Sequence, residues 1–103
     1  MQKEIVSVVF SFIKPEFVSE AVKVYQKAIE NKKKFKGCID IQLFRKVNHR
    51  NEFMIVSKWK TLEEREEYLK SEFHKKVVGI LKLYRQNDPI MKNFEQIMEK
   101  DNK

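Results

Sequence analysis

The sequence of 103 residues predicts one α+β domain in which helices cover one face of an antiparallel sheet. Three observations support this prediction: segments with the two-residue period of strands, segments with the helical period, and the order in which they alternate. That order is strand, helix, strand, strand, helix, strand. A chain of this length forms a single domain with a thin core.

The first part of the chain contains a strand followed by a helix. Residues 5–13 are mostly β-branched or aromatic, and both faces of this predicted strand are largely apolar. Pro15 suits the first position of a helix, where its missing N–H removes no hydrogen bond. From Phe17 to Ile29 the apolar residues form one stripe at helical spacing. Near the end of this helix lie four lysines, interpreted as solvated side chains that complement the helix dipole: Lys32, Lys33, Lys34 and Lys36.

A β-hairpin is predicted in the middle of the chain. Apolar and polar residues alternate over Cys38–Arg45, which is the period of a half-buried strand. A second apolar strand is expected over Phe53–Trp59. The polar, Asn-containing residues 47–51 between them are typical of a turn, so the two strands should pair in antiparallel fashion.

Two capping signals begin the helices that follow the hairpin. Thr61 and Glu64 form a capping box, in which the threonine hydroxyl caps the helix and the glutamate reaches back. This helix continues through Leu69, and Ser71 offers a second N-cap before another apolar stripe. Gly79 within that stripe either weakens the helix slightly or permits close packing.

A fourth strand is expected to complete the sheet. Asp88-Pro89 should end the preceding helix, Ile90–Ile97 should form the strand, and the residues from Met98 onward should fray. The complete order is that of the ferredoxin-like fold, βαββαβ, with a four-stranded antiparallel sheet in one domain over residues 1–103. Helices cover only one face of such a sheet, yet the first strand is apolar on both faces, so the sequence predicts a homodimer.

Composition excludes several kinds of site. The formal net charge is +7, but acidic residues are interspersed among the lysines, which favours a solvated surface over an anionic partner. The one cysteine, Cys38, excludes an intrachain disulfide and a CxxC metal site, and is interpreted as a small buried hydrophobe. No apolar run approaches the length of a membrane span, and the N-terminus carries no secretory signal, so we expect a cytoplasmic protein.

Nucleic-acid binding is the main alternative from another class of protein. RNA-recognition modules share this element order and are often basic. They stack bases on glycine-flanked aromatic residues of the third strand. The corresponding strand here, Phe53–Trp59, lacks the glycines and the paired aromatic residues. We therefore expect neither nucleic acid nor a membrane as a partner.

One ordered set of residues extends from position 37 to about position 73: Gly37-Cys38, Gln42-Leu43-Phe44-Arg45, Asn48, Asn51, Phe53, Ile55-Val56, Trp59, Thr61 and Leu69. In this order and spacing the segment resembles the antibiotic biosynthesis monooxygenase family. No single motif in it is specific, and the resemblance lies in the set. It implies a ferredoxin-like domain that dimerises through its sheets into an α/β barrel, in agreement with the homodimer expected from the strands.

The resemblance also implies a class of activity. Members of the family include monooxygenases that oxidise quinols or polyketide phenols with O₂ and use no metal or flavin, so no cofactor is expected. In such enzymes the substrate is the reductant, and the protein holds it in an apolar pocket, favours its deprotonated form and stabilises the oxygen adduct. The implied function is a cofactor-independent monooxygenase that acts on a small apolar or aromatic molecule.

Several polar positions depart from the family's pattern. Tyr68 and Phe73 stand where two histidines are common, and Ile55 stands where phenol-oxidising members carry an Asn. Haem-degrading members combine an Asn on the first strand with a Trp at the position of Tyr68, and both are missing here. These differences disfavour haem degradation. They also leave open an alternative function, a non-catalytic small-ligand-binding or stress-related homodimer of the same fold.

Three side chains are candidate catalytic groups. Trp59 either orients a substrate through its indole N–H or packs in the core. His74 either acts as a general base or lies partly exposed beside the Ser71 cap. Tyr68 either donates a hydrogen bond to a substrate oxygen or packs under the helix. A cavity in which these three converge favours chemistry, whereas an aliphatic cavity favours binding alone. His49 in the turn is too far from His74 for a metal site to be expected.

The remaining candidates are residues that line a substrate pocket. Asp40 and Gln42 are expected on one strand face with Cys38 and Phe44, where they line the pocket or hydrogen-bond across the dimer. Small side chains on the first strand are expected to leave space for the cavity. The predicted pocket residues are Ser7, Ser11, Asp40, Gln42, Phe53, Ile55 and Phe73.

Overall fold

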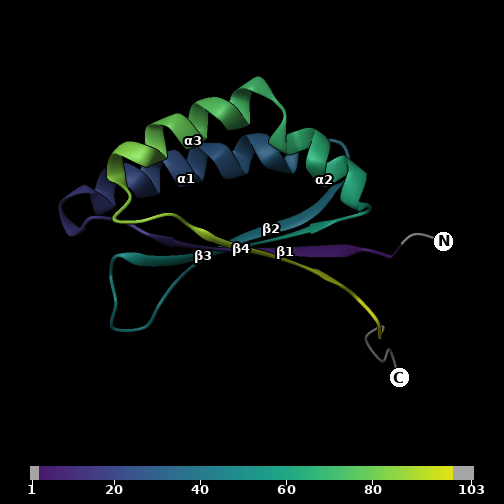
Figure 1. Cartoon of the computed structure of the whole chain (residues 1–103), viewed down its shortest axis with the longest axis horizontal. Coiled ribbons are helices and arrows are strands. Elements are labelled where there is room, and N and C mark those ends of the chain that lie inside the picture. Colours follow the sequence, from purple (N-terminus) through teal and green to yellow (C-terminus); the bar gives the residue numbers. More distant parts are fainter. Residues whose placement is uncertain (1–2, 99–103) are drawn as a thin grey trace.

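The structure, a computed structural model that describes residues 3–98, has two layers. Three α-helices lie on one face of a four-stranded antiparallel sheet (Figure 1), which confirms the predicted α+β, ferredoxin-like fold. Within the described residues, none of the helices combines the length and the apolar character needed to cross a membrane. The elements are β1 (Ile5–Phe12), the 3₁₀ turn η1 (Pro15–Phe17), α1 (Val18–Lys33), β2 (Cys38–Arg45), β3 (Glu52–Trp59), α2 (Leu62–Leu69), α3 (Glu72–Tyr84) and β4 (Ile90–Glu95).

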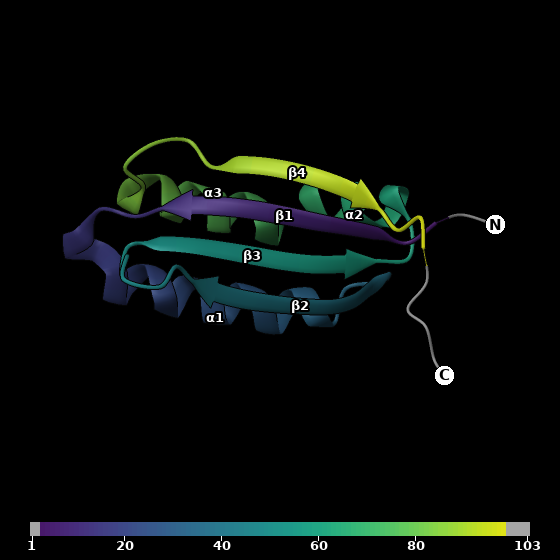
Figure 2. The same cartoon turned by 90° about the horizontal axis from the view of Figure 1, so that it is seen from below.

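The strands lie in the spatial order β2-β3-β1-β4, with β1 and β3 at the centre (Figure 2). On β1, Ser7 pairs with Ser57 of β3 and with Asn93 of β4. The β2–β3 connection turns at Asn48, whose φ of 66° is a left-handed conformation that Asn tolerates better than most residues. The predicted hairpin and its turn are therefore confirmed.

The core lies between the helices and the sheet. Tyr25 of α1 packs on Phe53 of β3 with ring centroids 5.5 Å apart, and its hydroxyl donates a hydrogen bond to Ser11 of β1. An aromatic side chain that reaches from a helix to two strands fixes the helix over the sheet through both packing and a polar contact. The buried core cluster consists of Ile13, Ala21, Tyr25, Phe53 and Leu81.

The opposite face of the sheet carries no helix among the described residues (Figure 2), and its apolar side chains lie next to polar ones such as Lys58 and Lys92. Its side chains alternate with the buried ones along each strand, so that Val8 lies beside Val56 and Val6 beside Phe94. Phe94 is 52% exposed. We call this surface the apolar face; it comprises Val6, Val8, Phe10, Phe12, Phe44, Met54, Val56, Ile90 and Phe94.

A β-bulge in β2 corrects one sequence prediction. Cys38 lies opposite Trp59, whereas Asp40 lies opposite Lys58, so the register shifts by one residue between them. Cys38 therefore faces the helices, while Asp40 and the residues that alternate with it face the other way. The expected common face for Cys38 and Asp40 is wrong, because one extra residue reverses the alternation. Burial raises the pKa of the Cys38 thiol.

Two element boundaries also differ from the sequence predictions. The helix α3 ends at Tyr84, before Asp88-Pro89, because the chain there returns to the sheet: the Gln86 N–H donates to the Phe12 carbonyl at 2.8 Å. The last strand ends at Glu95 and not at Ile97. Of the segment predicted to fray, only Met98 lies within the described residues.

The two glycines provide a matched pair for a stability test. Gly37 has a φ of +90°, and a Cβ added there would lie 2.6 Å from Cβ of Glu64. We expect Gly37→Ala to lower the free energy of unfolding by about 1–3 kcal/mol, because both the backbone and the contact oppose a side chain. Gly79 is exposed and has no neighbour within 4 Å, so Gly79→Ala should raise it by about 0.5–1 kcal/mol.

Urea unfolding at one protein concentration measures both variants against the parent chain. Equal effects of the two substitutions would contradict this account of Gly37. The sequence left open whether Gly79 weakens its helix or permits close packing. Because nothing lies within 4 Å of a Cβ added there, Gly79 does not serve close packing.

Candidate functional site

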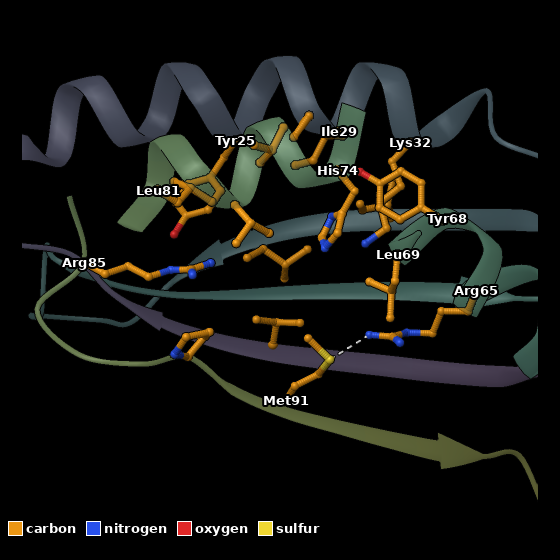
Figure 3. A pocket seen from close by; sticks show the side chains of 17 residues that line it. Tyr25, Ile29, Lys32, Arg65, Tyr68, Leu69, His74, Leu81, Arg85 and Met91 are labelled. Carbon is orange, nitrogen blue, oxygen red and sulfur yellow. Dashed lines mark hydrogen bonds between the residues drawn. The ribbon is translucent and has the colours of Figure 1, made fainter. Parts of the chain in front are cut away.

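A cavity of about 230 Å³ lies between the helices and the sheet. We call it the helix–sheet cavity (Figure 3). Its walls are mostly aliphatic, and one of the predicted pocket residues, Ile55 of β3, lies among them. Val9 of β1 and Ile41 of β2 complete the sheet side, and Ile29, Val77 and Leu81 line the helix side. The cavity is therefore a largely apolar space that only a small molecule can fill.

The polar side chains in this cavity are mostly cationic. Lys32, Arg65 and Arg85 line it, together with His74, whereas no Asp or Glu is among the lining residues in the described part of the chain. Within residues 3–98, no salt bridge involves any of the three cations. An apolar cavity with unpaired positive charges on its wall has a potential that favours anions.

Arg65 is the most buried of these cations, with 3% of its surface exposed. It comes from α2, which begins at the predicted cap: the Glu64 N–H donates to Thr61 Oγ1 at 3.1 Å. One terminal nitrogen of the guanidinium lies 3.0 Å from the sulfur of Met91 (Figure 3), while Nε has no partner among the described residues. Burial lowers the pKa of Arg65. A buried cation without a carboxylate is costly unless another anion reaches it.

Lys32 corrects the prediction that the lysine cluster is wholly solvated. Lys33, Lys34 and Lys36 are exposed, as expected, but Lys32 turns into the cavity from the end of α1. Its ammonium lies 5.1 Å from the ring centroid of Tyr68, a cation–π contact. Burial, reinforced by the nearby Arg65, lowers the pKa of Lys32 to about 8, so it remains mostly charged at neutral pH.

His74 lines the helix–sheet cavity and packs against Tyr68 with the rings tilted by 56° and their centroids 5.1 Å apart (Figure 3). It is placed by the predicted cap of α3, where its own N–H donates to Ser71 Oγ at 3.2 Å. Burial and then the cations Lys32, Arg65 and Arg85 lower the pKa of His74 to about 4. The imidazole is therefore neutral at pH 7 and able both to donate and to accept a hydrogen bond.

Tyr68 and Trp59 have different positions relative to the cavity. Tyr68 lines it, and burial raises the pKa of its hydroxyl to about 12, so this group is a protonated hydrogen-bond donor at neutral pH. Trp59 is fully buried behind Tyr68, with ring centroids 5.8 Å apart, and its indole N–H donates to Ser57 Oγ at 3.0 Å. Two of the three predicted catalytic groups therefore meet in the cavity, and the third supports one of them.

The other predicted pocket residues do not line the helix–sheet cavity. Ser11 accepts the hydrogen bond of Tyr25, and Phe53 packs in the core. Ser7 is fully buried, and its hydroxyl has no partner among the described residues. Asp40 and Gln42 lie on the opposite side of the sheet. Phe73 is half-buried on α3 and does not line the cavity. The predicted pocket residues outside the cavity are therefore Ser7, Ser11, Asp40, Gln42, Phe53 and Phe73.

The three cations are the functional candidates that sequence reasoning missed. Each continues an apolar helical stripe: Lys32 follows Ile29 by three residues, Arg65 precedes Tyr68 by three, and Arg85 follows Leu81 by four. A cation in phase with an apolar stripe was therefore the available signal.

These features define a ferredoxin-like α+β domain with a cationic cavity under its helices. The model of the antibiotic biosynthesis monooxygenase family matches residues 5–79, so the chain belongs to this family. The match confirms the resemblance seen over the hairpin and extends it to the first strand and α1. No protein with a curated function matches the sequence.

Solved structures with the same fold come from several organisms. A conserved protein of unknown function from Bacteroides thetaiotaomicron, described as a possible oxidoreductase, is 22% identical, with a TM-score of 0.85 over 93% of this chain and 100% of that one. A conserved protein from Methanosarcina mazei Go1 is 20% identical, with a TM-score of 0.86 over 90% and 92%. SnoaB, a cofactor-independent oxygenase from Streptomyces nogalater, is 12% identical, with a TM-score of 0.84 over 94% and 96%. At these identities the likeness shows the fold.

The neutral state of His74 leads to a prediction about pH. The pKa of His74 is about 4 in the folded chain and about 6.5 when it is unfolded, so the unfolded chain binds more protons between these values. Stability should therefore rise with pH across this window and be lost as the pH falls from about 6.5 towards 4. Urea unfolding at several pH values should show a smaller loss on acidification for His74→Gln than for the parent chain.

NMR provides the direct control. In a His49→Gln background the single remaining imidazole should titrate with a midpoint below about 5, because burial and the cations of the cavity oppose its protonation. A midpoint near 6.5 would mean that His74 does not experience the positive potential described above.

Proposed function

We propose that this protein is a cofactor-independent monooxygenase that oxidises a small phenol or quinol with O₂ in the helix–sheet cavity. The observation that carries the proposal is the composition of that cavity: apolar walls, three cations, a neutral imidazole and, among residues 3–98, no lining carboxylate. Membership of the antibiotic biosynthesis monooxygenase family supports the same class of reaction.

The cations supply what such a reaction needs first, an ionised substrate. A phenol reduces O₂ far more readily as its phenolate, and nearby positive charge lowers the pKa of a phenol. Lys32 lies beside the ring of Tyr68, and Arg65 reaches the cavity nearer the sheet (Figure 3), so a substrate oxygen between them has positive charge on two sides. The apolar surroundings strengthen these interactions relative to water.

The reaction then balances without an added reductant. The phenolate gives an electron to O₂, the two radicals combine at a ring carbon to form a C–O bond, and the O–O bond breaks. The ring carbon loses its proton, one oxygen atom remains as a carbonyl, and the other leaves as water. Overall, a phenol and O₂ give a quinone and water, so the four electrons come from the substrate itself.

His74 has a role that depends on the bound anion. With the cavity empty, its pKa of about 4 makes it a weak base. A bound phenolate offsets the charges of Lys32 and Arg65, which raises the pKa of His74 when substrate is present, although burial still opposes its protonation. We assign His74 as the group that accepts the proton from the ring carbon. Tyr68 donates to the substrate oxygen, and Trp59 holds Tyr68 in place.

Oxygen uptake by the metal-free protein, measured with EDTA present and with a panel of hydroquinones and polycyclic phenols, tests the reaction. We expect saturable uptake, and a value of kcat/KM about tenfold to a hundredfold lower in Arg65→Gln, because a charge-assisted hydrogen bond contributes about 1.5–3 kcal/mol. His74→Gln should lower kcat. Lys34→Gln removes an exposed cation near the same end of α1 and should leave the rate unchanged.

If Arg65→Gln and Lys34→Gln lower the rate of oxygen uptake equally, the charge of Arg65 in the cavity has no specific role in the reaction. Ligand binding with no uptake for any substrate would favour the alternative function, a non-catalytic binding protein of the same fold.

We also infer that two copies pair through the apolar face to form an α/β barrel. Large contiguous apolar patches are rare on monomeric proteins, and a second sheet covers this one with side chains of the same kind. The helices lie on the other side of the sheet (Figure 1), and the helix–sheet cavity lies between them and the sheet, so pairing through the apolar face does not cover it. The cytoplasmic location expected from the sequence stays a prediction.

Light scattering after size-exclusion chromatography tests the homodimer. Phe94→Glu places a charge on the apolar face and should shift the dimer towards the monomer, because the carboxylate would be buried at the interface. Leu83→Glu is the matched control: Leu83 is also an exposed apolar residue, at 67%, but it lies on α3. A parent chain that elutes as a monomer would contradict the inference.

A further inference from the structure

The helix–sheet cavity is cationic at both of its ends. In Figure 3, Arg65 and Lys32 reach into one end beside Tyr68, whereas Arg85 reaches in from the opposite end, where α3 stops. The other lining side chains are mostly aliphatic, and among them Leu69 lies beside Arg65 in this view. A small oxygen anion held between Arg65 and Lys32 occupies only one of these ends, so the proposed reaction gives no role to Arg85.

Arg85 is available for an anion. Its Nε is buried and has no hydrogen-bond partner among residues 3–98. Asp88 is near enough to Arg85 to favour its charged form. The two side chains nevertheless form no salt bridge in the described structure. The neighbouring Tyr25 hydroxyl is directed to Ser11. A guanidinium with free N–H groups at the wall of an apolar cavity matches a planar carboxylate, which accepts two parallel hydrogen bonds.

We propose that the substrate is a small aromatic hydroxy acid, with its carboxylate on Arg85 and its ionisable hydroxyl between Lys32 and Arg65. The part played by the hydroxyl rests on the proposed monooxygenase function, whereas the carboxylate site stands on the geometry of Arg85. Such a dianion offsets two of the three cations of the cavity. Its size is one or two rings, because 230 Å³ is below the range of about 300–1,000 Å³ common for ligand sites.

Binding measured without oxygen separates this proposal from the reaction. The probes are two matched pairs, 6-hydroxy-2-naphthoate with 2-naphthol and 4-hydroxybenzoate with phenol, in which only the carboxylate differs. Calorimetry or ligand fluorescence should give the acid of at least one pair a Kd about tenfold or more below that of its partner, as expected for a carboxylate that gains charge-assisted hydrogen bonds. The hydroxyl of 6-hydroxy-2-naphthoate points away from its carboxylate, as the two ends of the cavity require.

Substitution at Arg85 assigns the preference to one end. Arg85→Gln should reduce the acid preference to less than about threefold while leaving the Kd of the neutral phenol unchanged, and Arg85→Lys should retain part of it. Lys82→Gln is the matched control, because Lys82 is an exposed cation in the last turn of the same helix and does not line the cavity. Its acid preference should equal that of the parent chain. The unchanged Kd of the phenol also serves as the check on folding.

Equal affinity for acid and phenol in both pairs, a preference that survives Arg85→Gln, or no binding of any probe would each overturn the proposal. The oxygen-uptake assay fails independently. Selective binding of the acid without uptake would retain the carboxylate site and remove the monooxygenase function. Oxygen uptake with the phenols, together with equal affinity for acid and phenol, would retain the monooxygenase function and remove the carboxylate site.

Discussion

The burial of three cations in the wall of one apolar cavity is the constraint on which the rest of the site depends. Lys32, Arg65 and Arg85 come from three different segments and line a space to which the described part of the chain contributes no carboxylate. Burial and then these charges keep His74 neutral, and burial together with Arg65 lowers the pKa of Lys32 to about 8. Unpaired buried cations raise the free energy of the empty protein. A bound anion lowers this electrostatic cost, and the difference contributes to the affinity for an anionic ligand.

Small residues at the centre of the sheet make room for the aromatic side chains of the site. Ser11 lies under Tyr25 and Ser57 accepts the indole N–H of Trp59. The serines on β1 were expected to leave open space for a cavity, but at Ser11 this space is filled by a ring from α1. Trp59, Phe35 and Tyr68 pack together with tilted or edge-to-face geometry, which holds the Tyr68 hydroxyl at one position in the wall. Aromatic packing by Trp59 and Phe35 thus positions Tyr68 in the wall of the cavity.

Sequence periodicity predicted the fold well because each element buries one face. The strand Cys38–Arg45 and the caps at Thr61 and Ser71 are where the sequence indicated. The bulge after Cys38 was not predictable, because an extra residue does not interrupt the apolar pattern of β2. The cations were missed for a related reason: a lysine or arginine at the end of an apolar stripe often extends to solvent. Whether it turns inward depends on where its helix meets the sheet, which is a tertiary property.

The sheet of this protein is a single layer that separates the helix–sheet cavity from the apolar face. On β1, Val9 lines the cavity while its neighbours Val8 and Phe10 belong to the apolar face, so successive residues of one strand serve two separate surfaces. Side chains that line the cavity point away from those that we infer to decide subunit pairing. Across evolution the two properties can therefore diverge at different rates. A lineage can exchange Arg85 and acquire a new substrate while the assembly of its subunits is inherited unchanged.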